Sequence, residues 1–264
     1  LFRHYNIHPL AFLPKIAFFY RFSNGIKSTA CQIQHRDLYY IKYFFNAINQ
    51  SARKNMEEFV INAFDLFGTV IFAITGAVRG VRHRLDMLGV IVLACVVGVG
   101  GGIIRDTIIG ATPVTAFTKE SYLLVCIITG MAVFFTPPSA INRNIITVCD
   151  AIGLGVFTAI GAAKGVQFHL TPIGIVLAGV FTAVGGGVLR DIMVGMVPVV
   201  LKSDFYATAS LIGGVVYCIL VSLGVPVFFT FIIVSLLVIV LRLLGYRYKL
   251  QLPVAELSEQ DKEE

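Results

Sequence analysis

The sequence predicts an all-α, polytopic membrane protein with seven transmembrane helices, arranged as two inverted repeats of three helices plus one. Three observations lead to this fold class: an apolar composition, a series of membrane-length apolar segments, and an internal repeat. Hydrophobic residues make up 57% of the 264 residues and charged residues 14%, and the mean hydropathy is +0.84. A soluble domain is about half apolar and about a quarter charged, so this composition indicates a chain that lies in a lipid bilayer.

Apolar segments of near-membrane length follow one another from residue 59 onward. A helix needs about 20 mainly apolar residues to cross a bilayer, and the breaks carry Pro, Gly or charged residues. The expected spans are 59–78, 87–110, 121–135, 145–163, 172–195, 205–223 and 226–244. The expected domains are a first repeat over 59–137, a second repeat over 145–223, a seventh helix over 226–245 and a polar, acidic tail over 246–264.

The segment from Asp65 to Val114 is repeated without a gap from Asp150 to Val199. The offset is 85 residues throughout (150 − 65 = 85), and 18 of the 50 aligned positions are identical. Apolar composition alone would not hold the shared Asp, Arg and Pro in register. Each repeat contains three spans, an odd number, so the second repeat enters the membrane from the opposite side. Many transporters share this inverted plan, with the solute site near the middle of the membrane.

Residues 1–56 form a basic N-terminal extension that we expect to be loose. Their longest apolar run, 11–20, is too short to span a membrane, and no convincing cleavage site of a signal peptide follows it. Met56 stands just before the first strong span. The sequence therefore suggests that the natural chain starts near Met56.

A glycine triplet lies inside the second expected span and another inside the fifth. The six residues are Gly100, Gly101, Gly102, Gly185, Gly186 and Gly187. Small residues let membrane helices pack closely, but each glycine also weakens a helix interior by roughly 1 kcal/mol relative to alanine. We expect the triplets to break their helices and to line a cavity, since freed backbone groups in a membrane must be satisfied by protein or by water.

An Arg-Asp pair follows each triplet, Arg105-Asp106 in the first repeat and Arg190-Asp191 in the second. Charges at membrane depth are costly and face a partner charge, a cavity or a pathway. One interpretation is a pair of crossed salt bridges, Arg105 with Asp191 and Arg190 with Asp106, that holds the repeats together. The other is a pathway in which the arginines meet a carboxylate and the aspartates meet an ammonium group or a cation.

Asp65 and Asp150 occupy equivalent positions in the first turns of the first and fourth spans. An acidic side chain near a helix N-terminus favours the start of the helix, and this is the role we expect for both residues. A place at the mouth of the pathway is the alternative.

Several functional classes find no support in the sequence. No catalytic constellation, dinucleotide fingerprint or P-loop is present, so we expect no enzyme and no cofactor. The cysteines are odd in number, without C-x-x-C spacing, which argues against a metal site or a disulfide framework; they are Cys31, Cys95, Cys126, Cys149 and Cys218. The net charge of +6 comes mostly from residues between apolar segments, rather than from a basic stripe that would bind nucleic acid.

The basic residues of the loops predict an orientation, because cytoplasmic loops carry the excess of Lys and Arg. With the N-terminus outside, the inner side holds Arg79, Arg82, Arg84, Arg143, Lys202, Arg242, Arg247 and Lys249. The outer side then holds Arg53, Lys54, Lys119 and Lys164. The loops therefore predict an outside N-terminus and an inside C-terminus in a plasma membrane.

The doubled patterns D-x-x-G-x-x-x-F-x-x-x-G-A and G-G-G-x-x-R-D-x-x-x-G-x-x-P span residues 59 to about 245. They resemble the bacterial proteins with two tandem glycine-transporter domains, which are homologous to the trimeric intracellular cation (TRIC) channels. The resemblance implies seven helices, a homotrimer with one pathway per subunit, and glycine-rich segments of the second and fifth helices that bend around the pore.

Two functions compete on this basis. The first is a carrier for glycine or a similar small amino acid, held by a paired Arg and Asp at a helix break. The alternative is a TRIC-like potassium channel in which exposed carbonyls replace the water around the cation, provided that the neighbouring arginines are neutralised. A membrane scaffold is disfavoured because a scaffold does not need doubled helix breaks.

Overall fold

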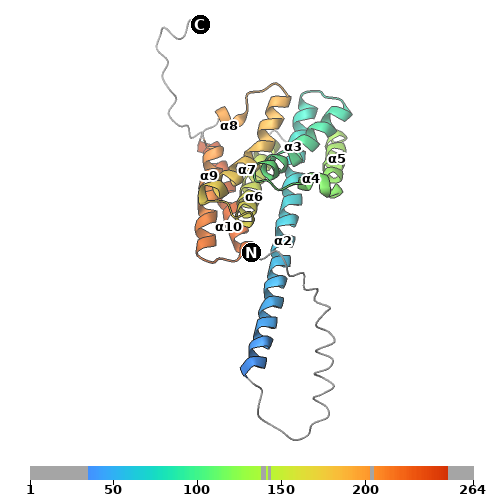
Figure 1. Cartoon of the computed structure of the whole chain (residues 1–264). Coiled ribbons are helices and arrows are strands. Elements are labelled where there is room, and N and C mark those ends of the chain that lie inside the picture. The colour runs from blue at the N-terminus through green and yellow to red at the C-terminus, as the bar shows by residue number, and fades with distance from the viewer. Residues whose placement is uncertain (1–34, 138–140, 142–143, 203–204, 249–264) are drawn as a thin grey trace. The chain divides into compact units, whose positions relative to one another are not determined.

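The protein consists of helices joined by short turns, without strands, in the part of the chain that the computed structural model describes, residues 35–137, 141, 144–202 and 205–248 (Figure 1). Of residues 35–57 and 202 only the backbone is described. The helices are α2 His35–Arg82, α3 Met87–Ile108, α4 Thr115–Thr118, α5 Glu120–Phe134, α6 Ile145–Gln167, α7 Pro172–Met193, α8 Val199–Lys202, α9 Ala207–Ser222 and α10 Val227–Tyr248.

Five described helices are long and apolar enough to cross a membrane: Glu58–Arg82 within α2, and α3, α6, α7 and α10. The shorter apolar helices α5 and α9 complete the two sets of three. The predicted fold class is thereby confirmed, and each expected span corresponds to one of these seven helices. The short helices α4 and α8 were not predicted; they follow the Arg-Asp pair in each repeat.

Part of the N-terminal extension lies in a helix. The chain divides into two compact units, Leu1–Lys54 and Asn55–Glu264, and the membrane helices belong to the second. Residues 35–54, expected to be loose, are helical and form the first part of α2. Extending an existing helix adds a hydrogen bond for each residue fixed, without a new nucleation cost. Residues 1–34 and the tail from residue 249 lie outside the described residues.

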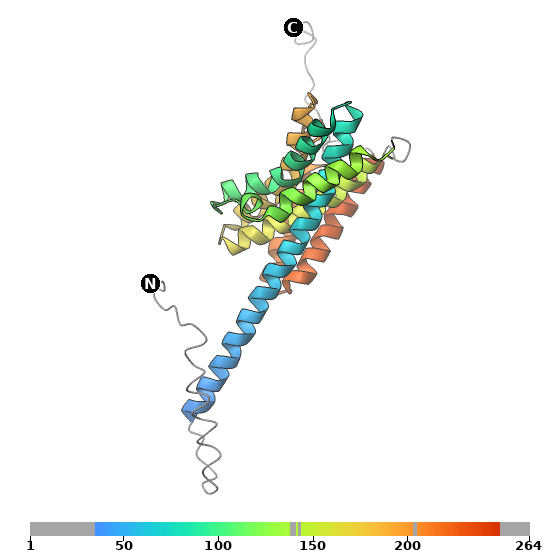
Figure 2. The ribbon, with the colours of Figure 1, turned by 90° about the vertical axis from the view of Figure 1, so that its right-hand side faces the viewer.

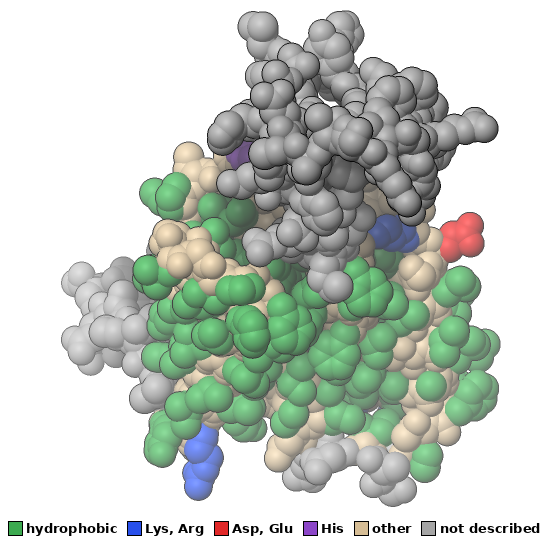
Figure 3. All heavy atoms as spheres, turned by 90° about the horizontal axis from the view of Figure 1, so that it is seen from below, with side chains coloured by type: hydrophobic (Ala, Val, Ile, Leu, Met, Phe, Trp, Pro, Cys, Tyr) green, Lys and Arg blue, Asp and Glu red, His purple; other side chains and the backbone are tan. Residues whose placement is uncertain are grey.

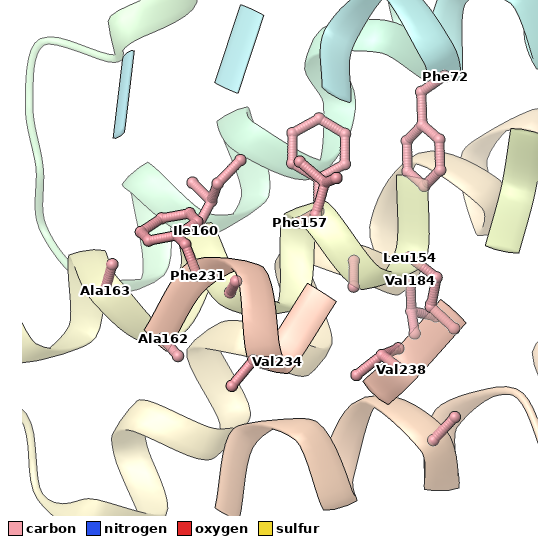
Figure 4. Packing of buried hydrophobic residues seen from close by; sticks show 14 of the residues in the cluster. Phe72, Leu154, Phe157, Ile160, Ala162, Ala163, Val184, Phe231, Val234 and Val238 are labelled. Atoms are coloured by element: carbon pink, nitrogen blue, oxygen red, sulfur yellow. The ribbon is translucent and has the colours of Figure 1, made fainter. Parts of the chain in front are cut away.

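Helix α6 is central within the second unit, and α10 is peripheral. The most apolar stretch of α6 is 72% buried, whereas that of α10 is 33% buried. Helix α6 packs against α7, α9 and α10, and Phe157 of α6 meets Phe72 of α2 with ring centroids 4.9 Å apart (Figure 4). Figure 3 shows hydrophobic side chains over most of the described part of one face, with charged side chains near its margins. Such a surface suits a lipid environment.

Helices α3 and α7 cross at the two glycine triplets, and neither helix is broken there. A Cβ atom added to Gly101 would collide with the carbonyl oxygen of Thr182, and one added to Gly186 would lie 2.5 Å from the carbonyl oxygen of Val97. The two contacts are equivalent (186 − 101 = 85, 182 − 97 = 85). The expected helix break is therefore wrong. The triplets instead let two helix backbones approach closely, as small residues do between membrane helices.

Equivalent residues begin and end these crossing helices. The Asp86 carboxylate accepts a hydrogen bond of 2.7 Å from the Gly89 amide at the start of α3, and Thr171 caps α7 through its hydroxyl. Both helices end before a glycine with positive φ, Gly110 (+73°) and Gly195 (+70°), a conformation that residues with a Cβ atom adopt at a cost. The chain then turns into α4 in one repeat and α8 in the other.

Candidate functional site

Two buried polar clusters lie beyond the helix crossing, one in each repeat. The first cluster consists of Asp65, Arg105, Asp106 and Tyr122, from α2, α3 and α5. The second cluster consists of Asp150, Arg190 and Asp191, from α6 and α7, with Tyr206 just before α9. Both arginines are 1% exposed.

The first cluster holds its arginine between two carboxylates. Arg105 Nε donates to Asp106 Oδ1 at 2.8 Å, and Arg105 Nη2 lies 3.6 Å from Asp65 Oδ2. The Tyr122 hydroxyl donates to the same Asp65 oxygen at 3.1 Å. The second oxygen of Asp106 accepts from the Thr115 amide at the start of α4, at 3.0 Å. Asp106 therefore joins the buried cation to the turn that follows α3.

The second cluster repeats this plan with a shorter ion pair. Arg190 Nη1 donates to Asp150 Oδ1 at 2.8 Å, and Arg190 Nε donates to Asp191 Oδ1 at 3.0 Å. A Cβ atom added to Gly187 would lie 2.8 Å from the Tyr206 hydroxyl oxygen and 3.7 Å from both Arg190 Nη2 and Asp150 Oδ1. The third glycine of this triplet thus leaves room for the converging side chains.

The turn after α7 is also held by the cluster. The second oxygen of Asp191 accepts from the Val199 amide at the start of α8, at 3.0 Å. Arg190 Nη1 additionally donates to the Thr75 hydroxyl of α2 at 3.2 Å, a contact that comes from the first repeat.

The expected crossed pairs of Arg105 with Asp191 and of Arg190 with Asp106 are wrong. Each arginine binds the aspartate beside it and the aspartate 40 positions earlier in its own repeat (105 − 65 = 40, 190 − 150 = 40). The physical reason is that α2 with α3, and α6 with α7, bring an acid and a base together within a repeat. At that distance the cost of burying each charge is lowered by a direct partner.

The expected role of Asp65 and Asp150 at helix starts is also corrected. Helix α2 begins at His35, far before Asp65, and Asp150 is the sixth residue of α6. Both carboxylates are buried, 4% exposed each, and both pair with an arginine. Their charge is compensated by a side chain rather than by the N-terminus of a helix.

An ion pair between the repeats does exist, but a different arginine makes it. Arg79 Nη2 of α2 lies 3.7 Å from Asp191 Oδ1. Lys164 occupies the equivalent position in the second repeat (164 − 79 = 85). Lys164 interacts electrostatically with Asp65 and Asp106 of the first cluster, but among the described residues it forms no ion pair within 4.0 Å. The second cluster therefore receives a closer compensating charge from the other repeat than the first.

A small cavity adjoins the first cluster. Its volume is about 10 Å³, enough for about one water molecule. Its lining residues are Asp65, Thr69, Gly98, Val99, Gly102, Arg105, Asp106, Thr115, Ala116, Tyr122 and Phe157. Of the predicted pathway glycines, Gly102 lines this cavity, while Gly100 and Gly185 face Leu189 and Ile104 of the crossing helix.

Sequence reasoning missed the two tyrosines because the repeat register shifts by one residue after Pro113. Tyr122 and Tyr206 are offset by 84 (206 − 122 = 84) rather than by 85. The same shift relates Gly130 and Gly214 (214 − 130 = 84), whose added Cβ atoms would lie 3.1 Å from equivalent Cα atoms. A gapped alignment of the repeats would have exposed both tyrosines.

No group of three or more His, Cys, Asp or Glu side chains that could hold a metal ion occurs among the described residues. The clusters instead provide buried carboxylates, guanidinium groups and phenol hydroxyls. Each cluster has one carboxylate more than it has arginines, and a cation of the other repeat lies near each one: Arg79 is 3.7 Å from Asp191, and Lys164 interacts with Asp65 and Asp106 from a greater distance. Such groups can coordinate water or a passing ion, and they offer no nucleophile activated for covalent chemistry.

The fold and these clusters, buried among membrane-length helices, define a multi-pass membrane transport protein. The glycine transporter family matches the chain twice, over residues 62–138 and 147–222. The chain belongs to this family, and it is homologous to the TRIC channels, as the solved structures below show.

The relatives of known sequence are membrane proteins of bacteria. A UPF0126 membrane protein of Vibrio cholerae is 36% identical over 197 residues, covering 74% of this chain and 82% of the relative. The UPF0126 inner membrane protein YadS of Escherichia coli is 35% identical over 198 residues, covering 74% and 96%.

Two solved structures share the fold. The TRIC orthologue from Rhodobacter sphaeroides is 34% identical, with a TM-score of 0.68, over 72% of this chain and 99% of that one. A structure that describes conductance through TRIC cation channels is 36% identical, with a TM-score of 0.68, over 75% and 98%. The relatives are thus channels and membrane proteins rather than enzymes.

Proposed function

We propose that this protein is a homotrimeric channel for monovalent cations, with potassium as the ion, in a bacterial inner membrane. The observation that carries this proposal is the pairing of each buried arginine with two carboxylates. An unpaired arginine on the pathway would repel cations, as the sequence suggested. With two aspartates around it, Arg105 instead lies in a cluster with a net negative charge, which attracts a cation.

The pathway that we propose runs past the two clusters within each subunit. Gly102 and Gly187 stand beside them. The first two glycines of each triplet serve the crossing of α3 and α7, and we assign them a packing role. The solved TRIC structures at 34–36% identity support both the cation and the trimer.

The glycine carrier is the weaker of the two functions, although the family name favours it. Glycine would need one free arginine for its carboxylate and one free aspartate for its ammonium group. In each cluster the arginine is already bound by two aspartates. The cavity of about 10 Å³ holds about one water molecule and is too small for an amino acid.

We keep the predicted orientation as a proposal: an odd number of spans separates the two ends, with the C-terminal end of α10 facing the cytoplasm. Single cysteines placed at Lys119 and Arg247 in a cysteine-free chain test it by labelling of intact cells. An impermeant maleimide should react at position 119 and not at position 247; the reverse result would invert the orientation.

The channel function is tested by reconstitution of the full chain into planar bilayers under a potassium chloride gradient. We expect a current with a reversal potential close to that of potassium. Asp106→Asn should move the reversal potential toward zero, because it removes the net negative charge of the first cluster. Asp86→Asn is the matched control, since Asp86 is an exposed helix cap that asparagine replaces well.

Saturable counterflow of glycine in liposomes, without current, would overturn the channel and establish the carrier. Native mass spectrometry of the detergent-purified protein tests the trimer separately, and a monomer would contradict it.

A further inference from the structure

The two clusters differ in which buried polar atom lacks a hydrogen-bond partner among the described residues: Arg105 Nη1 in the first cluster and the Tyr206 hydroxyl in the second. Arg105 Nη1 is buried and has no hydrogen-bond partner among the described residues, although Arg105 is 1% exposed. The equivalent atom, Arg190 Nη1, has two acceptors, Asp150 Oδ1 and the Thr75 hydroxyl. A buried donor without an acceptor is costly, especially on a charged group, so something outside the described side chains must satisfy Arg105.

One of the two acceptors is missing because of a substitution between the repeats. The position equivalent to Thr75 is Ile160 (160 − 75 = 85), and Ile160 is fully buried. Thr75 of the first repeat accepts a hydrogen bond from Arg190 of the second, but Ile160, a hydrocarbon side chain, cannot do the same for Arg105.

The surroundings of the first cluster contain space and polar groups that the second lacks. Arg105 lines the cavity of about 10 Å³ together with Thr69, Thr115 and Ala116. The equivalent residues of the second repeat are larger or apolar: Leu154, Val199 and Val200 (154 − 69 = 85, 199 − 115 = 84, 200 − 116 = 84). At these three positions the second repeat therefore has only hydrocarbon side chains, whereas the first repeat has two hydroxyl groups and a methyl group.

We propose that the cavity beside the first cluster is a site for a single water molecule, which accepts a hydrogen bond from Arg105 Nη1. The volume matches one water, and a buried water needs two to four polar partners, which Arg105, Asp65, Tyr122 and the two threonines supply. An anion would face the carboxylates of Asp65 and Asp106. A cation would face the donor of Arg105.

The site concerns this chain's own hydration, and it stands whether or not the channel proposal holds. Its consequence within a channel is that a cation passing the first cluster meets a fixed water bound to Arg105, whereas at the second cluster Arg190 Nη1 is bound by protein acceptors. The two repeats would then be unequal steps of one pathway.

A structure of the full chain in nanodiscs, at a resolution that shows ordered water, tests the site. We expect one water peak within hydrogen-bond distance of Arg105 Nη1 in the natural chain. An empty cavity, or a protein acceptor bound directly to Nη1, would overturn the proposal. The result does not depend on whether potassium current is seen.

Two variants of matched shape sharpen the test. Ile160→Thr supplies the hydroxyl that Thr75 supplies in the other repeat, and it should remove the water peak and take over the hydrogen bond. Ile160→Val introduces a side chain of the same shape as threonine but without the hydroxyl, and the water should remain. A water that persists in Ile160→Thr in unchanged contact with Arg105 would refute the equivalence of the two positions.

Discussion

The two buried clusters contain the same residues, two aspartates, an arginine and a tyrosine, yet their surroundings make them different. In the second cluster Arg190 binds Asp150 at 2.8 Å and Thr75 at 3.2 Å, and Arg79 reaches Asp191 from the other repeat. In the first cluster the corresponding ion pair is 3.6 Å long, and a cavity adjoins it. Duplication of a sequence therefore duplicates the charges of a site, while the neighbours decide how firmly those charges are held.

The seventh helix adds to this difference. The Arg242 guanidinium of α10 lies over the Tyr206 ring of the second cluster, 4.7 Å from the ring centroid, a distance at which a cation and an aromatic ring attract each other. No repeat supplies an equivalent helix to the first cluster. The second cluster is thus supported on one more side.

The largest loss of stability is expected when the shorter ion pair, Arg190 with Asp150, is broken. Asp150→Asn leaves Arg190 with one compensating carboxylate, and we expect a loss of about 3–5 kcal/mol, as for other buried pairs. Asp65→Asn should cost clearly less, since the Arg105–Asp65 contact is 3.6 Å long. Thermal unfolding of the purified protein measures both. Equal losses would mean that the two clusters are held alike.

The second prediction concerns the helix crossing, where the repeats behave symmetrically. Gly101→Ala and Gly186→Ala each place a Cβ atom against a backbone carbonyl of the other helix, and overpacking costs about 1–3 kcal/mol. Gly102→Ala is the control within the same triplet, because its Cβ would lie 3.6 Å from the nearest atom. Unfolding temperatures should fall for the first two variants and stay near the natural value for the third.

The third prediction concerns the Thr75 hydroxyl, an acceptor that has no equivalent at the first cluster. Thr75→Val removes the hydroxyl that accepts from Arg190 Nη1 while keeping the shape of the side chain. We expect a loss of about 1 kcal/mol, the net contribution of one hydrogen bond, seen in chemical denaturation. An unchanged midpoint would show that this hydroxyl contributes nothing to the second cluster.

The smallest change in stability is expected for the ion pair between the repeats, Arg79 with Asp191. Arg79 is partly exposed, with 17% of its side chain accessible, and exposed pairs contribute about 0–1 kcal/mol. Arg79→Gln should lower the unfolding temperature slightly, and less so at high salt. Lys164→Gln, which breaks no ion pair among the described residues, should leave it unchanged. A larger effect for Lys164→Gln would reverse the order of the two positions.

Much of the fold was predictable because its signals are local. Apolar segments of membrane length located the spans, and the shared Asp, Arg, Gly and Pro positions located both repeats. The partner of Arg105 was not predictable, since it depends on which face of α2 meets α3. The predicted helix break at the glycine triplets was wrong for a related reason. The triplets stay helical because another helix packs against them, and the sequence of one segment does not reveal that packing.

The carboxylates of Asp106 and Asp191 each have two tasks, since one oxygen holds an arginine and the other holds the first amide of a short helix. A guanidinium that shifts therefore pulls on the chain segment leading out of α3 or α7. A movement of either buried guanidinium is thus coupled to the conformation of the turn before α4 or α8, and a spectroscopic probe attached to one of these short helices would report it.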